Sequence, residues 1–67
     1  MNINIRSYII DNFKNDEIDD IRKSIDKSIK SEEDEPLIGL GVFFELLWKN
    51  SDERTKSQIL TNIKKGI

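Results

Sequence analysis

The sequence of 67 residues contains no cysteine and no histidine. Without cysteine the chain cannot form a disulfide, and without both residue types it cannot build a Cys/His zinc site. Catalytic arrangements that use cysteine or histidine as nucleophile or base are excluded as well. The stability of so short a chain must come from helix packing, from a partner or from a second copy. We expect no enzymatic activity, no small-molecule substrate, no metal and no cofactor.

Long apolar runs are also lacking. The longest, Leu37–Trp48, is interrupted by two glycines and by Glu45. It falls short of the roughly 20 residues that a membrane-spanning helix needs. The N-terminal residues Met1–Arg6 carry neither the basic region nor the apolar stretch of a signal peptide. We therefore expect a soluble intracellular protein that does not associate with a membrane.

No excess of positive charge is present, because 36% of the residues are charged and the formal net charge is −2. A general nucleic-acid-binding protein usually carries a basic stripe or patch. One helix face carries three lysines, but two aspartates of the same segment largely neutralise it (Lys23, Lys27, Lys30; Asp19, Asp26). A DNA-binding alternative would combine these lysines with Lys64 and Lys65, and it is the least favoured of our hypotheses.

What the sequence does contain is apolar residues at helical spacing, which predicts four short helices and no strand. The first runs from a capping Asn4 to about Phe13, with Ile3 and Tyr8 placed as a hydrophobic staple. The second begins at a cap formed by Asn15 or Asp16. Its stripe, suited to packing against one partner helix, consists of isoleucines only: Ile18, Ile21, Ile25 and Ile29.

The third and fourth helices are separated by Asn50 and Ser51, which we expect to end one helix and to cap the next. Glycines at 39 and 41 each cost about 1 kcal/mol of helix propensity, so the third helix is expected to start only near Leu40. Alternatively, these glycines let another helix approach closely. The fourth helix, Asp52–Lys65, has an apolar face and a stop at Gly66.

The third helix is densely apolar and contains Phe43, Phe44 and Trp48. A helix that is apolar nearly all round must be surrounded by other elements. We therefore predict an all-α fold, a small bundle of about four short helices around this central helix, in one domain spanning residues 1–67. The only stripe left to face water is Gly41, Glu45 and Lys49.

Two residues of this helix allow two interpretations each. Trp48 is either a core residue, which we favour, or an exposed anchor for a partner. Glu45 is either an exposed residue paired with Lys49, which we favour, or a buried polar contact or oligomer contact.

The central segment resembles the signature of the small acid-soluble spore protein I family. In that family a Gly-Leu-Gly-Val stretch leads into an aromatic residue, a glutamate, two aliphatic residues and a tryptophan. Here the signature and core positions are Gly39, Leu40, Gly41, Val42, Phe44, Glu45 and Trp48. The likeness extends to Asn4-Ile5-Arg6, Ile9-Ile10, the acidic loop and the end near Gly66. It departs at Ile38, where the family usually has a proline.

This resemblance implies a minor protein of the spore core in spore-forming Firmicutes, made in the forespore during sporulation. It implies no enzymatic activity and no defined molecular role, and it is distinct from the major DNA-coating spore proteins. A second hypothesis comes from the residues themselves: the third helix has more large apolar side chains than three short helices cover. The chain would then be a helical interaction module that acts as a homodimer or binds a protein partner.

Overall fold

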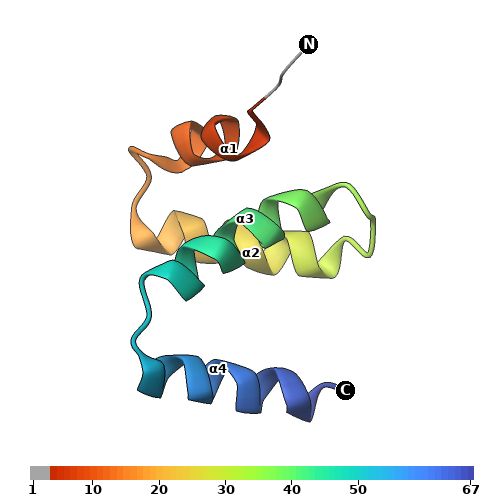
Figure 1. Ribbon diagram of the computed structural model, residues 1–67. Helices are drawn as coiled ribbons and strands as arrows, with labels where there is room; N and C mark the ends of the chain where they lie inside the picture. Colours follow the sequence, from red (N-terminus) through yellow and green to blue (C-terminus); the bar gives the residue numbers. More distant parts are fainter. Residues whose placement is uncertain (1–3) are drawn as a thin grey trace.

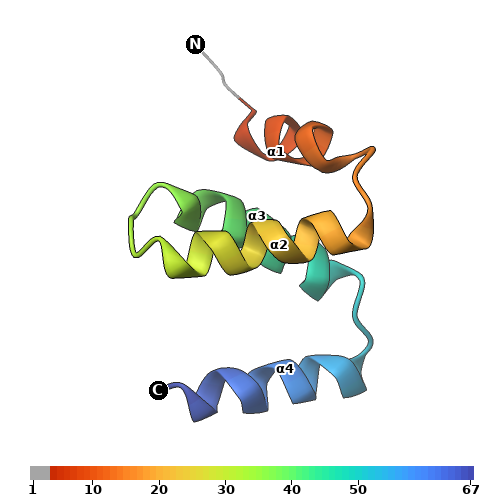
Figure 2. The same cartoon turned by 180° about the vertical axis from the view of Figure 1, so that it is seen from behind.

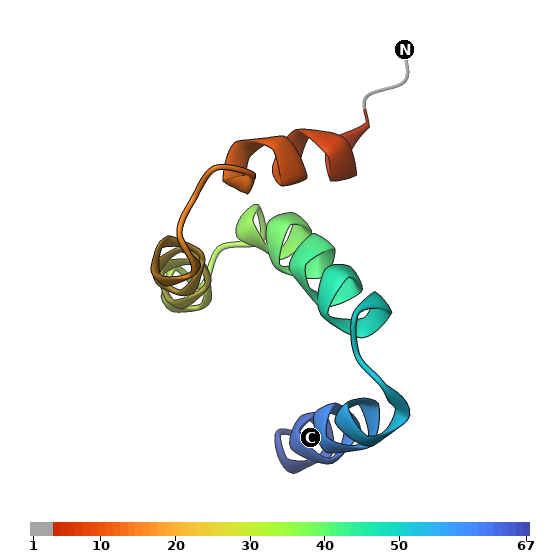
Figure 3. The ribbon, with the colours of Figure 1, turned by 90° about the vertical axis from the view of Figure 1, so that its left-hand side faces the viewer.

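The computed structural model describes residues 4–67, and within them it contains helices and no strand. The helices are α1 (Ile5–Phe13), α2 (Ile18–Lys30), α3 (Pro36–Lys49) and α4 (Glu53–Lys65) (Figure 1). Helix α3 packs against both α1 and α2. Helix α4 lies away from α1 and α2 in all three views (Figures 1, 2 and 3). The predicted all-α class is confirmed.

Helix α1 begins as predicted. The side-chain oxygen of Asn4 accepts a hydrogen bond from the backbone N–H of Ser7 at 3.0 Å, which satisfies one of the unpaired amides at the helix start. The predicted staple between Ile3 and Tyr8 involves a residue outside the described range. The local sequence is therefore sufficient to place the start of α1.

The cap predicted for α2 is wrong by one or two residues. Glu17, not Asn15 or Asp16, is the N-cap, and it forms a reciprocal capping box with Asp20. The backbone N–H of Glu17 donates to a carboxylate oxygen of Asp20 at 3.2 Å. The carbonyl of Glu17 accepts the first helical hydrogen bond, from the N–H of Ile21 at 3.2 Å, whereas the N–H of Asp16 belongs to the turn that follows α1.

The start of α4 also differs from the prediction by one residue. Asp52 rather than Ser51 caps the helix, because its carboxylate accepts from the backbone N–H of Thr55 at 2.8 Å. This hydrogen bond lowers the pKa of Asp52 below its ordinary value, since it favours the charged carboxylate. Asn50 and Gly66 stand at the C-terminal ends of α3 and α4, as predicted.

Helix α3 begins at Pro36 and not near Leu40. Proline fits the first helical turn because its missing N–H would have no partner there. Packing on α1 and α2 then outweighs the low helix propensity of Gly39 and Gly41. A Cβ atom added to either glycine would meet no other heavy atom within 4 Å, so the predicted close approach of another helix is wrong.

The core lies where α1 and α2 meet α3, and it is small. Val42, at 6% exposure, is the one buried hydrophobic residue in the described part of the chain. Next to it in sequence, the ring of Phe43 meets that of Phe13 edge to face, with 5.0 Å between their centroids. The isoleucine stripe of α2 is only partly used, since Ile21 and Ile25 are half-buried whereas Ile18 and Ile29 are exposed.

The prediction that the rest of the chain wraps α3 on nearly all sides is wrong. Phe44, Leu46 and Leu47 are 42%, 36% and 46% exposed, so water reaches much more than the stripe of Gly41, Glu45 and Lys49. The reason is that α1 and α2 cover one side of α3, while α4 diverges from it after the connection at residues 50–52 (Figure 3).

The molecule is accordingly more open than other folded chains of its size. Its radius of gyration is 13.2 Å, whereas about 11 Å is typical of a compact domain of this length. Its accessible surface is 6146 Å², against roughly 4,400 Å² for a folded monomer of 7.8 kDa. No helix in the part that the structure describes is long and apolar enough to cross a membrane.

Candidate interaction surface

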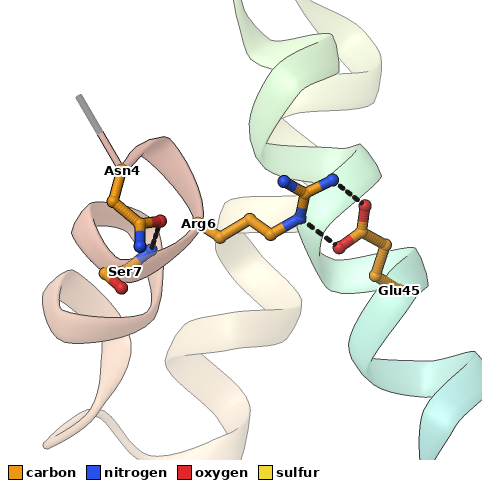
Figure 4. A network of polar contacts seen from close by, with 4 residues as sticks. All are labelled: Asn4, Arg6, Ser7 and Glu45. Carbon is orange, nitrogen blue, oxygen red and sulfur yellow. Dashed lines mark hydrogen bonds and ion pairs between the residues drawn. The ribbon is translucent and has the colours of Figure 1, made fainter. Parts of the chain in front are cut away.

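A bidentate ion pair fixes α1 across α3. Nε of Arg6 lies 2.6 Å from Oε2 of Glu45, and Nη2 of Arg6 lies 2.8 Å from Oε1 (Figure 4). Two parallel charge-assisted hydrogen bonds of this kind add geometric specificity to the attraction between the charges. The contact therefore sets the orientation in which α1 crosses α3.

The ion pair stands at the edge of the helix contact and remains open to water. The Arg6 side chain is 66% exposed and the Glu45 side chain 37%. The hydrogen bonds from Arg6 lower the pKa of Glu45, assisted by the positive charges of Arg6 and Lys49 and opposed by partial desolvation. The same contact raises the pKa of Arg6. Both groups are thus held in their charged forms.

Our favoured interpretation of Glu45 as the partner of Lys49 is wrong, because Arg6 holds the carboxylate. The pairing with Arg6 was not predicted from the sequence, although a signal was present. Glu45 is the one charged residue in Pro36–Trp48, and Arg6 is the one cation in α1. The one cation of α1 and the one acid of α3 carry opposite charges, so they are natural partners when the two helices pack together. The two parts of the family resemblance, Asn4-Ile5-Arg6 and the central signature, are joined by this ion pair.

The structure distributes the predicted signature residues over two sides of α3. Val42 and Glu45 border a pocket shared with Arg6 of α1. Phe44 and Trp48 instead stack on each other, with ring centroids 5.9 Å apart, and line a groove toward α4. Gly41 also borders the pocket shared with Arg6, and the remaining members, Gly39 and Leu40, are half-buried helix positions.

The groove between α3 and α4 has a volume of about 330 Å³ and an almost entirely apolar lining. Phe44 and Trp48 form its α3 side together with Glu45 and Lys49 at its edge, and Leu60, 54% exposed, forms its α4 side. The ammonium group of Lys56 lies 5.1 Å from the centre of a Trp48 ring, which is within the range of a cation–π interaction. Trp48 is therefore half-buried at the contact with α4, and neither a core residue nor a free anchor.

Exposed apolar residues continue on both helices beyond this groove. Leu47 is 46% exposed and lies three positions after Phe44, which makes the two neighbours on the helix surface. Ile63 is 43% exposed and lies three positions after Leu60. We call the surface formed by Phe44, Leu47, Trp48, Leu60 and Ile63 the α3–α4 face.

A second apolar groove, of about 340 Å³, lies where α1, α2 and α3 meet. Leu46 is its most exposed α3 residue, at 36%. Its other apolar lining residues include the ring pair of the core and two isoleucines of the α2 stripe (Ile10, Phe13, Ile21, Ile25, Phe43). This groove is thus a surface depression of the core.

The charged side chains that the structure describes form no metal site, although three lysines and Asp26 line one surface pocket on α2. Among residues 4–67, no group of His, Cys, Asp or Glu residues is arranged to hold a metal ion. The lysine face of α2 is partly neutralised, since the ammonium of Lys23 lies 3.2 Å from a carboxylate oxygen of Asp19. Lys64 and Lys65 stand at the far end of α4, which lies apart from α2 (Figures 2 and 3).

Comparison with known proteins supplies what the geometry alone does not. The family model described as "Small, acid-soluble spore protein I" matches residues 3–67. Proteins of that name from Bacillus cereus (strain G9842), Bacillus mycoides (strain KBAB4) and Bacillus anthracis (strain A0248) are each 36% identical over 67 residues. The match spans 100% of this chain and 97% of each relative. No solved structure matches the chain significantly.

The match covers the ion pair between α1 and α3, the central signature and α4 alike, so it extends over the fold and not over one motif. The chain belongs to the small, acid-soluble spore protein I family.

Proposed function

We propose that this chain is a non-enzymatic protein of the spore core, made in the forespore during sporulation. The observation that carries the proposal is the family match over residues 3–67, together with the spore-protein relatives over the whole chain. The composition supports it, because a chain without cysteine and histidine lacks the side chains of the commonest nucleophile–base pairs.

Quantitative proteomics on a sporulating culture tests this proposal. The protein should be absent from vegetative cells, appear after the forespore has formed, and remain in dormant spores after chemical removal of the coat. A coat protein that is lost on the same treatment serves as the control for decoating. Detection in growing cells alone, or loss together with the coat, would contradict the proposal.

The second candidate function is that of a helical interaction module acting as a homodimer. The observation that favours it is the α3–α4 face, which leaves five large apolar side chains half-buried or exposed on adjoining helices. Contiguous apolar surface of this kind usually marks an interaction site in a soluble protein. This function is compatible with the first, since a spore-core protein can act as a dimer.

A further inference from the structure

We propose that two copies of the chain close their α3–α4 faces on each other, so that α3 and α4 of both copies form an antiparallel four-helix bundle. The inference rests on the homodimer candidate above and specifies its surface and geometry. In this arrangement a two-fold axis runs along the bundle, and α4 of each copy packs between its own α3 and that of the partner.

The area of exposed surface fits a second copy. Relative to a folded monomer of the same mass, the chain exposes an excess of about 1,800 Å². A stable interface of standard size buries about 800 Å² on each partner. The excess surface is therefore large enough for one complete protein interface.

The α3–α4 face is favoured over the second apolar groove because its α4 side is the less covered. The second groove lies between α3 and the two helices that already pack on it, α1 and α2. Helix α4, in contrast, meets α3 chiefly around Trp48, while Ile63 and Ile67 beyond this contact are 43% and 91% exposed. A further helix laid along α4 would cover these residues.

Charge and helix direction select the antiparallel arrangement. Helix α4 contains one acid and four bases, a net charge of +3, with Lys64 and Lys65 in its last turn. The loop before α3 carries four consecutive acids, residues 32–35. A two-fold axis along the bundle places the basic end of the partner's α4 beside this acidic loop. It also runs α4 of the partner roughly opposite in direction to α3, which crosses its own α4 obliquely (Figure 3).

Sedimentation equilibrium of the full chain at 10–200 µM, in roughly 100 mM NaCl, tests the surface. The Leu60→Glu variant changes a residue that is 54% exposed in one copy, so circular dichroism should show an unchanged helix content. We expect it to weaken dimerisation by about 30-fold or more, as expected for a central interface residue. The matched control is Ile18→Glu on α2, where an 86% exposed isoleucine lies outside the proposed interface and the dimer should persist.

A charge exchange tests the direction of the helices. Lys64→Glu with Lys65→Glu should weaken the dimer severalfold, and adding Glu33→Lys with Glu35→Lys should restore it. This restoration distinguishes a contact between copies from mere damage to the end of α4, since the loop substitutions do not repair that helix end.

Three outcomes overturn the inference, and they bear differently on the proposed function. A strict monomer at 200 µM removes both this interface and the homodimer candidate, without affecting the spore-core proposal. A dimer that survives Leu60→Glu but is lost in Leu46→Glu assigns dimerisation to the second groove, which overturns this interface only. The third outcome is that Leu60→Glu abolishes the dimer as expected, but the loop substitutions do not restore the dimer of the Lys64→Glu, Lys65→Glu variant. That result overturns the antiparallel geometry.

Discussion

Arg6 and Glu45, which lie 39 residues apart in the sequence, connect α1 to α3. Most exposed ion pairs contribute little to stability, because water screens the charges and the side chains lose freedom. This pair is better placed, since its geometry is bidentate and its carboxylate is partly shielded. Because few other contacts hold α1 to α3, we expect the pair to have a measurable effect.

Replacing Glu45 with Gln should lower the melting temperature by a few degrees at pH 7. The pKa of Glu45 is lowered in the folded chain, so its stabilising contribution is present above the unfolded pKa of about 4.3. That contribution is lost as the pH falls through the lowered folded pKa, and wild type and variant should then melt alike. Thermal denaturation followed by circular dichroism between pH 2.5 and 7 measures this difference.

Two further variants identify the partner of Glu45. Arg6→Gln should reproduce the loss, and combining it with Glu45→Gln should add almost nothing. Lys49→Gln should have a smaller effect because Lys49 contributes only the last of the causes that lower this pKa. Equal losses in the Arg6 and Lys49 variants would contradict the assignment.

Val42 is the side chain whose truncation should be most costly. Val42→Ala removes two buried carbon atoms, which corresponds to about 1.6 kcal/mol of lost burial, before any term for the cavity left behind. Urea denaturation measures the loss. Ile29→Ala is the control, because its side chain is 63% exposed and its loss should leave stability within about 0.5 kcal/mol.

At the scale of the helices, the sequence predicted number, type and approximate bounds well. Apolar spacing and local capping chemistry are sufficient for this, as the cap at Asn4 shows. Predictions that depended on what lies beside a helix did less well. The wrapping of α3 was wrong because periodicity reports how apolar a face is, and not how much of it the rest of the chain can reach. The partner of Glu45 was missed for the same reason.

The start of α3 shows how packing can override propensity. Gly39 and Gly41 predicted a late start, yet both lie within a helix that begins at Pro36. The conformational freedom of these glycines in the unfolded chain therefore lowers the stability of the fold. No neighbouring atom requires the absence of a side chain at either position. Alanine fits the same backbone and lowers the entropy of the unfolded chain.

Gly39→Ala should accordingly raise the stability of the chain by about 0.4–1 kcal/mol in urea denaturation. Gly66→Ala is the control, because Gly66 lies past the end of α4 and a Cβ there would touch a carbonyl oxygen at an ordinary 3.5 Å. Its effect should stay within about 0.5 kcal/mol. If Gly39→Ala instead destabilised the chain, this expectation would be contradicted, and a neighbouring segment would have to lie close to position 39.

At the scale of the whole molecule, charge argues against DNA as a partner. The net charge is −2, and the lysines of α2 and α4 lie on helices that are apart. We expect no gel shift of duplex DNA in 50 mM salt, where contacts to phosphate are favoured. The Asp19→Asn, Asp26→Asn variant, with its lysine face unmasked, shows whether the assay detects weak binding. A shift by the wild-type chain would contradict this expectation.

The sparse attachment of α4, through the Lys56–Trp48 contact and the groove at Leu60, has a kinetic consequence. A segment held by so few buried contacts opens on its own, at a lower free energy than the whole chain needs. Its backbone amides should exchange with deuterium before those of α2 and α3. If a second copy packs on α4, this exchange slows as the protein concentration rises, whereas the amides of α1, which lies outside the proposed interface, keep their rate.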